Sequence, residues 1–288
     1  MSDPAILGIC RFSYLGQSDF AAFRGRPERT PAFLNKVAAD LYADQRMIAR
    51  FRAFETLCLP SVLAQQQPGF VFLIVTSPQM PKNWLTRLDA LCQGHDELQL
   101  VVSEATDLSQ ALLPALQDMH DASGGNFIQF RLDDDDALAV DYIARLRTHA
   151  QRMKGIDQFA ICFARGVQVA LYPGQATQYL SVGTPFLSAG LAVRMANPAR
   201  SIFTVPHLRT ANRFTSLIVH DTPAALQLRW PSDSRPLDPD RLPPDTRFLP
   251  HKEWTAILQQ NFPYLTGTDF EKLRVGGATD PPPTGSSV

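Results

Sequence analysis

The chain has 288 residues, of which 45% are hydrophobic, and its 27 basic and 28 acidic side chains give a net charge of −1. This length suits one large α/β domain or two small ones, and the hydrophobic content is enough for a substantial core. The balanced charge, without a basic cluster, argues against general nucleic-acid binding, so no nucleic-acid partner is expected.

Membrane and secretion signals are not expected in this sequence. The longest clean apolar run, residues 70–75, is far too short for a transmembrane segment. The N-terminus has neither the basic start nor the long apolar stretch of a signal peptide. The four cysteines lie far apart without a CxxC pair, which predicts reduced core residues and not zinc ligands or disulfides. We therefore expect a cytoplasmic protein, and peripheral contact with a membrane stays open.

The first half of the chain alternates short apolar runs with amphipathic patterns. Strands are predicted over residues 6–10, 70–75, 98–102 and 126–132. Residues 15–43 show no strong period and are expected to form a loop with short helical pieces. The best helix is predicted over residues 44–66, with a kink or break at Pro60.

Further helices are predicted from apolar residues at helical spacing, over residues 84–92, 108–119 and 139–153. Strands that alternate with helices indicate right-handed crossovers, and hence an α/β fold with a mostly parallel sheet flanked by helices.

The second half of the chain has a mixed pattern of strands and loops. Residues 159–163 and 167–171 are predicted to pair as a hairpin around Arg165–Gly166. At the small residues 188–190 we expect another group to approach the backbone closely. Residues 231–250, with six prolines and four aspartates, are predicted to be a lid near the mouth of the site. A helix is expected over residues 251–260, and a disordered tail over 275–288.

Four consecutive carboxylates, Asp133–Asp136, follow the strand over residues 126–132. A helical pattern comes next, so the acids are expected in a strand-to-helix turn, where open α/β sheets bind ligands. Four adjacent carboxylates repel one another, and a cation or raised pKa values relieve that repulsion. Carboxylate oxygens suit a hard ion, so the run predicts Mg²⁺ or Mn²⁺ between these acids and a diphosphate. The alternative is a solvated acidic turn that caps the next helix.

Three stretches of the sequence resemble GT-A glycosyltransferases. Residues 61–75 are similar to their SLLAQ-x-x-P-x-F element, residues 107–111 to their G-L-S-x-A helix start, and residues 132–136 to the L-D-x-D-D form of their DXD motif. More narrowly, the stretches CRFSYLG, ARFRAFETLCLPSVLAQ and FRLDDDDA look like a rhamnosyltransferase family of bacterial proteins.

The resemblance implies a single GT-A-like domain over residues 1–274. Residues 1–150 would bind a nucleotide-sugar donor, and residues 151–274 would meet the acceptor, a glycan or another hydroxyl compound. The implied activity is metal-dependent transfer of a sugar from a nucleoside diphosphate, and the narrower resemblance implies that this sugar is rhamnose. Asp133 matches the DXD acid near the ribose or metal, and Asp135 the metal-bound acid.

This sequence departs from GT-A enzymes after the second strand. Many of them carry aspartates there that hold the base or the sugar nucleotide, whereas Thr76 and Ser77 stand at those positions here. The usual preference for uridine is therefore not implied.

Other donor-site candidates follow from their positions in the chain. Arg11 follows the first strand and can reach a diphosphate, with a surface salt bridge as the alternative. Arg131 precedes the acids and is expected to neutralise them. Arg50 and Arg52 are expected on a solvated helix face. The predicted nucleotide-sugar site comprises Arg11, Ser13, Thr76, Ser77, Arg131, Asp133 and Asp134.

The predicted metal ligands are Asp133, Asp135 and His220. We prefer His220 to His207 because it ends an apolar strand-like piece, residues 217–219, and precedes Asp221. Asp136 and Asp221 are the candidate bases for the acceptor hydroxyl. Two other functions stay open: a metal-dependent phosphoesterase or nucleotidyltransferase that uses the same acids, and a non-catalytic carbohydrate-binding module.

Overall fold

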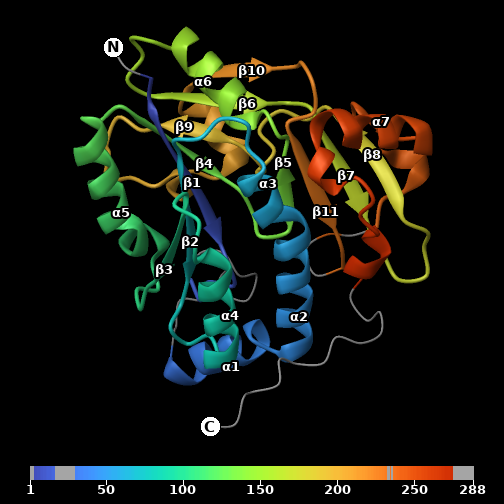
Figure 1. The fold of residues 1–288 in the computed structure, drawn as a ribbon, viewed down its shortest axis with the longest axis horizontal. Coiled ribbons are helices and arrows are strands. Elements are labelled where there is room, and N and C mark those ends of the chain that lie inside the picture. The colour runs from blue at the N-terminus through green and yellow to red at the C-terminus, as the bar shows by residue number, and fades with distance from the viewer. Residues whose placement is uncertain (1–2, 17–29, 232–233, 235, 275–288) are drawn as a thin grey trace.

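The computed structural model describes residues 3–16, 30–231, 234 and 236–274 (Figure 1). The predicted disordered tail, residues 275–288, lies outside the described residues. Two β-sheets form the framework, with helices around and between them. Among the described residues, no helix combines the length and apolar character needed to cross a membrane.

The first sheet has seven strands in the order β10-β6-β9-β4-β1-β2-β3. Its strands are β1 (Ala5–Arg11), β2 (Val71–Thr76), β3 (Leu98–Val102), β4 (Phe127–Arg131), β6 (Phe159–Phe163), β9 (Ala192–Arg194) and β10 (Thr215–Val219). Only β9 runs antiparallel to its neighbours among the described pairings of this sheet. The predicted mostly parallel α/β sheet is therefore confirmed.

Continuous apolar runs form the central strands because helices bury both faces of the sheet. One face packs on α1 (Pro31–Leu41), α2 (Asp44–Ala53), α4 (Lys82–Cys92) and α6 (Tyr142–Arg152), and the other packs on α5 (Leu108–Ser123). Gly8 of β1 makes the packing of two large rings possible, because a Cβ there would lie 2.3 Å from Phe130 and 2.4 Å from Phe72. All four cysteines are free and buried, as the sequence predicts.

Helix α1 corrects the expectation of a loop over residues 15–43. Thr30 caps its first turn by accepting a hydrogen bond from the Phe33 N–H, and Pro31 occupies the first helical position, where its missing N–H costs nothing.

The second sheet has five strands in the order β12-β8-β7-β11-β5. Its strands are β5 (Asp136–Leu138), β7 (Gly166–Ala170), β8 (Gln178–Val182), β11 (Ala225–Arg229) and β12 (Thr246–Phe248), and α7 (His251–Asn261) packs beside them. Leu237, Leu242 and Phe248 pack at the β8 edge, opposite β5, so this part of the expected lid lies away from Asp136.

The predicted hairpin between β6 and β7 is wrong, although both strands exist. β6 pairs with β9 and β10 in the first sheet, and β7 pairs with β8 and β11 in the second. The Ala164 N–H donates to Val219 O, and Arg165 O accepts from the Ala224 N–H. The two-residue connection therefore carries the chain from one sheet into the other, because better partners lie far along the sequence.

The predicted helix over residues 44–66 lies between the two sheets (Figure 1) and ends at Leu63. It consists of α2, a π-helical turn (Phe54–Cys58) and α3 (Leu59–Leu63). Phe51 and Cys58 face the first core, whereas Ala53 and Leu57 face the second. The Leu59 N–H donates to Phe54 O, and this π turn lets the helix continue through Pro60.

Candidate functional site

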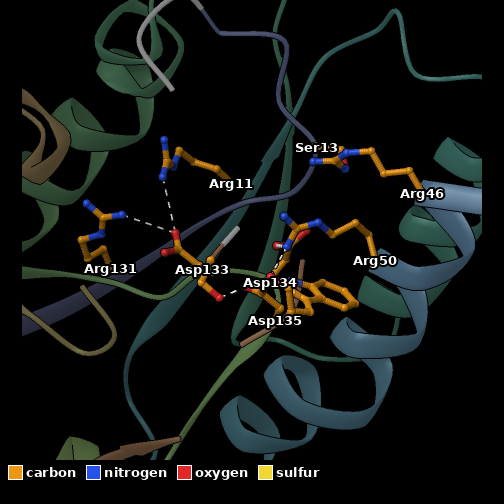
Figure 2. Close-up of polar contacts among 10 residues, drawn as sticks. Arg11, Ser13, Arg46, Arg50, Arg131, Asp133, Asp134 and Asp135 are labelled. Atoms are coloured by element: carbon orange, nitrogen blue, oxygen red, sulfur yellow. Dashed lines mark hydrogen bonds and ion pairs between the residues drawn. The ribbon is translucent and has the colours of Figure 1, made fainter. Parts of the chain in front are cut away.

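Two arginines meet at the carboxyl ends of neighbouring parallel strands. Arg11 ends β1 and Arg131 ends β4, and an Nη2 of each lies 3.4 Å from the same oxygen, Oδ1 of Asp133 (Figure 2). Val75 of β2 pairs with Arg11 in register. The carboxyl ends of β1, β2 and β4 therefore lie on one rim, as expected for the predicted mostly parallel sheet.

The acidic run is the connection between the two sheets. β4 ends at Arg131 in the first sheet, and β5 begins at Asp136 in the second. This corrects the expected strand-to-helix turn, since α6 begins only at Tyr142. The reason is a tertiary pairing: Asp136 lies opposite Gln227 in an antiparallel ladder with β11.

Arg50 of α2 binds the middle of the acidic run. Its Nη1 lies 2.9 Å from Oδ1 of Asp134 and 2.9 Å from Oδ2 of Asp135 (Figure 2). The guanidinium lies over the indole of Trp230, 5.2 Å from the ring centroid. The expectation that Arg50 is on a solvated face is wrong, because the helix is covered by a sheet on each side and the Arg50 side chain is only 11% exposed.

The repulsion within the acidic run is relieved by arginines and by a shifted pKa. Burial by itself would raise the pKa of Asp133, but Arg131 and Arg11 outweigh it and lower the pKa to about 2. Burial, together with Asp135 and Asp133, raises the pKa of Asp136 well above its usual range. Asp133 therefore stays ionised, while Asp136 takes up a proton more readily.

The carboxylates have the oxygen donors that Mg²⁺ or Mn²⁺ requires, but they are arranged around arginines. Asp133 is shared by two guanidinium groups, and Asp134 and Asp135 share a third. In the part of the chain that the structure describes, no three His, Cys, Asp or Glu side chains are placed to hold a metal ion. As arranged, these residues do not fit a divalent ion, whose binding stays a prediction from the sequence.

The structure does not bring His220 and Asp221 to the acids. Both follow β10, which is separated from β4 by β6 and β9, a distance of about 14 Å at the usual strand spacing. The Asp221 carboxylate instead forms an ion pair with Arg145 of α6. This corrects the predicted placement of His220 beside Asp135, because two other strands of the sheet lie between β10 and β4.

His207 is the histidine that the structure places near Asp133. It begins a short 3-10 helix, His207–Asn212. Burial and the charge of Arg131 lower its pKa, and Asp133 opposes them. The imidazole is therefore mostly neutral at neutral pH and adds little charge to the cluster.

The predicted polar residues after β1 and β2 lie together. The Leu15 N–H donates to Oγ of Ser77 at 2.9 Å, and Arg46 Nη1 lies 3.5 Å from Oγ of Ser13 (Figure 2). Ser13 has a positive φ of 44°, a strained conformation of the kind found at functional sites. Oγ1 of Thr76 is buried and has no hydrogen-bond partner among the described residues.

Comparison with known proteins decides the family. Residues 5–239 match the family model described as "Putative rhamnosyl transferase". The chain belongs to this family. It is thus a member of a glycosyltransferase family, as its sequence motifs predict. None of the curated proteins compared with the chain matches it.

Solved structures of other proteins have a distant likeness to this chain. TarS of S. aureus is 11% identical with a TM-score of 0.40, over 78% of this chain and 36% of TarS. A putative nucleotide-diphospho-sugar transferase from Desulfovibrio desulfuricans G20 is 12% identical with a TM-score of 0.34, over 80% of this chain and 81% of that one. The chain therefore spans about a third of TarS, and these scores are too low to assign an activity.

Sequence reasoning did not single out Arg46 or Phe203. It placed Arg50 on a solvated face and ranked His207 below His220. Arg46 and Arg50 are four residues apart and so share a helix face, a spacing that could have linked them to one anionic partner. No local signal marks Phe203 or His207, because they reach the site only through the path of the chain after β9.

Proposed function

We propose that this glycosyltransferase moves a sugar, rhamnose by its family description, from a nucleoside-diphosphate donor to a hydroxyl group of an acceptor such as a glycan. The observation that carries the proposal is the convergence of Arg11 and Arg131 at adjoining strand ends, in a chain of this family. Ligands of open α/β sheets bind at such strand ends, and guanidinium groups match phosphate oxygens in shape and charge.

The proposed chemistry places the two arginines at the charge that develops on the leaving group. When the sugar departs, the nucleoside diphosphate gains negative charge, and fixed guanidinium groups stabilise it. Asp133 lies between both arginines and holds them at the strand ends. Asp136 is buried against β11 and Asp221 is paired with Arg145, so the structure lends no support to either as the base.

A panel of nucleoside-diphosphate sugars, incubated with the protein and hydroxyl acceptors, tests the proposal. We expect release of a nucleoside diphosphate, and a fall in kcat/KM of about tenfold or more in Arg131→Gln. Arg147→Gln is the control, because Arg147 binds Gln67 and Gly69 O away from the strand ends. Parallel reactions with EDTA, Mg²⁺ or Mn²⁺ test the predicted metal dependence.

The product identifies the alternatives. Release of pyrophosphate or phosphate would support the nucleotidyltransferase or phosphoesterase function, and binding of a sugar without turnover would support a carbohydrate-binding module. Either result would contradict the proposal.

A further inference from the structure

Phe203 lies against both arginines of the site. It belongs to a short 3-10 helix, Ile202–Thr204, that follows β9. The Cζ atoms of Arg11 and Arg131 lie 4.6 Å and 4.8 Å from the centroid of its ring. Contacts of this length are cation–π interactions, which orient a guanidinium without using its N–H donors.

The contact with Asp133 leaves part of the Arg131 guanidinium without an acceptor. Nη2 of Arg11 and Nη2 of Arg131 each lie 3.4 Å from Oδ1 of Asp133, longer than the 2.7–2.9 Å typical of a charge-assisted hydrogen bond. Arg131 is 9% exposed, and its Nε is buried without a hydrogen-bond partner among the described residues. A buried donor without a partner is costly, and an anion that accepts from it would remove that cost.

The carboxylates of the acidic run are divided between two groups of arginines. Within the described cluster, two guanidinium groups face one carboxylate, and His207 adds little charge because its pKa is lowered. The second group of acids, Asp134 and Asp135, is bound by Arg50. The buried Nε of Arg131 is therefore the donor at which an anion would complete the hydrogen bonding of this part of the site.

We propose that Phe203 positions Arg11 and Arg131 as a clamp for the diphosphate of the donor, and that this clamp binds the diphosphate without a divalent cation. The inference rests on the proposed function, since it names how that donor is held. Phe203 is a positioning residue: it acts through the two arginines, while the phosphate oxygens accept hydrogen bonds from their N–H groups.

Calorimetry with inorganic pyrophosphate in EDTA tests the clamp directly, because pyrophosphate contains the group common to every such donor. We expect the wild-type protein to bind it, and Arg11→Gln and Arg131→Gln to weaken binding by about tenfold or more. Phe203→Leu is expected to weaken binding severalfold, and Phe203→Trp to restore it, because the second keeps an aromatic face.

Arg87→Gln is the matched control. Arg87 also lies over an aromatic ring, 4.9 Å from the centroid of Phe51, but it is paired with Glu55 on the outside of α4. Its loss is expected to leave pyrophosphate binding unchanged. Should Phe203→Leu fail to fold, Arg131→Lys replaces it, since lysine keeps the charge and loses the planar fork.

The result that would overturn the clamp is pyrophosphate binding that needs Mg²⁺ or Mn²⁺ and is unaffected by the Arg11 and Arg131 variants, or no binding at all. Such a result would leave sugar transfer itself standing if nucleoside diphosphate is released in the donor assay. Conversely, metal-free binding without turnover of any donor would support the clamp and contradict the proposed function.

Discussion

Arg50 shows how one residue connects the two halves of this molecule. It lies on the helix between the sheets, binds Asp134 and Asp135, and packs over Trp230. The side chains of Arg50, Asp134 and Asp135 are 11%, 7% and 9% exposed, so water screens these charges little. Removal of the arginine would leave two buried carboxylates without this cation. Loss of one partner of a buried ion pair is strongly destabilising, because the charge that stays behind is not compensated.

We predict that Arg50→Met lowers the free energy of unfolding by about 3 kcal/mol. Methionine fills similar space without a charge, so the effect reports the lost pairing. Urea denaturation followed by far-UV circular dichroism measures it. Arg52→Met is the control, because Arg52 donates to Lys272 O at the surface, and its loss is expected to cost less than about 1 kcal/mol. Equal losses in the two variants would show that the buried pair is not important for stability.

Among the elements, α5 contains a proline in its interior. Pro114 is the seventh residue of the helix and is exposed. Because proline has no N–H, Gln110 O does not receive the hydrogen bond that another residue at position 114 would donate. Pro60 differs, since it directly follows the π turn, which lets the helix continue past it.

We predict that Pro114→Ala raises the free energy of unfolding by about 1–2 kcal/mol. Restoring the hydrogen bond and removing the ring clash favours the helix, and the greater freedom of the unfolded chain offsets part of the gain. Pro60→Ala is expected to leave the free energy of unfolding unchanged, because the π turn already accommodates the proline. Thermal unfolding of the two variants beside the wild type is the measurement. A Pro114→Ala protein that melts no higher than Pro60→Ala would contradict this account of α5.

At the scale of the whole molecule, the two sheets share one helix. Phe51 and Cys58 belong to the core of the first sheet, and Ala53 and Leu57 to that of the second. We therefore propose that residues 1–274 form the single domain that the sequence predicts, because the same helix contributes side chains to both cores.

We predict that the two cores unfold in one transition. Trp84 lies in the first core, and Trp230 and Trp254 in the second. One variant keeps only Trp84 and another only Trp254, with phenylalanine at the other two tryptophans. Within each variant, the fluorescence and circular dichroism transitions in urea are expected to coincide. A fluorescence midpoint that differs from the circular dichroism midpoint of the same variant would show two independently stable units.

The sequence by itself determined the elements that arise from local patterns. The central strands, the long helix from Asp44 and the acidic run at the end of β4 follow from runs and spacings of neighbouring residues. Arg11 and Asp133 could also be brought together, because parallel strands that alternate with helices end on one rim.

Only the tertiary structure decided which distant segments meet. Arg50 and Asp134 are 84 residues apart, and β5 exists because β11 pairs with it. That His207, and not His220, lies near Asp133 depends on the order of four strands in the sheet. Strand pairing and ion pairs gain their energy from contacts between residues far apart in the chain, and periodicity within one segment carries no information about that partner.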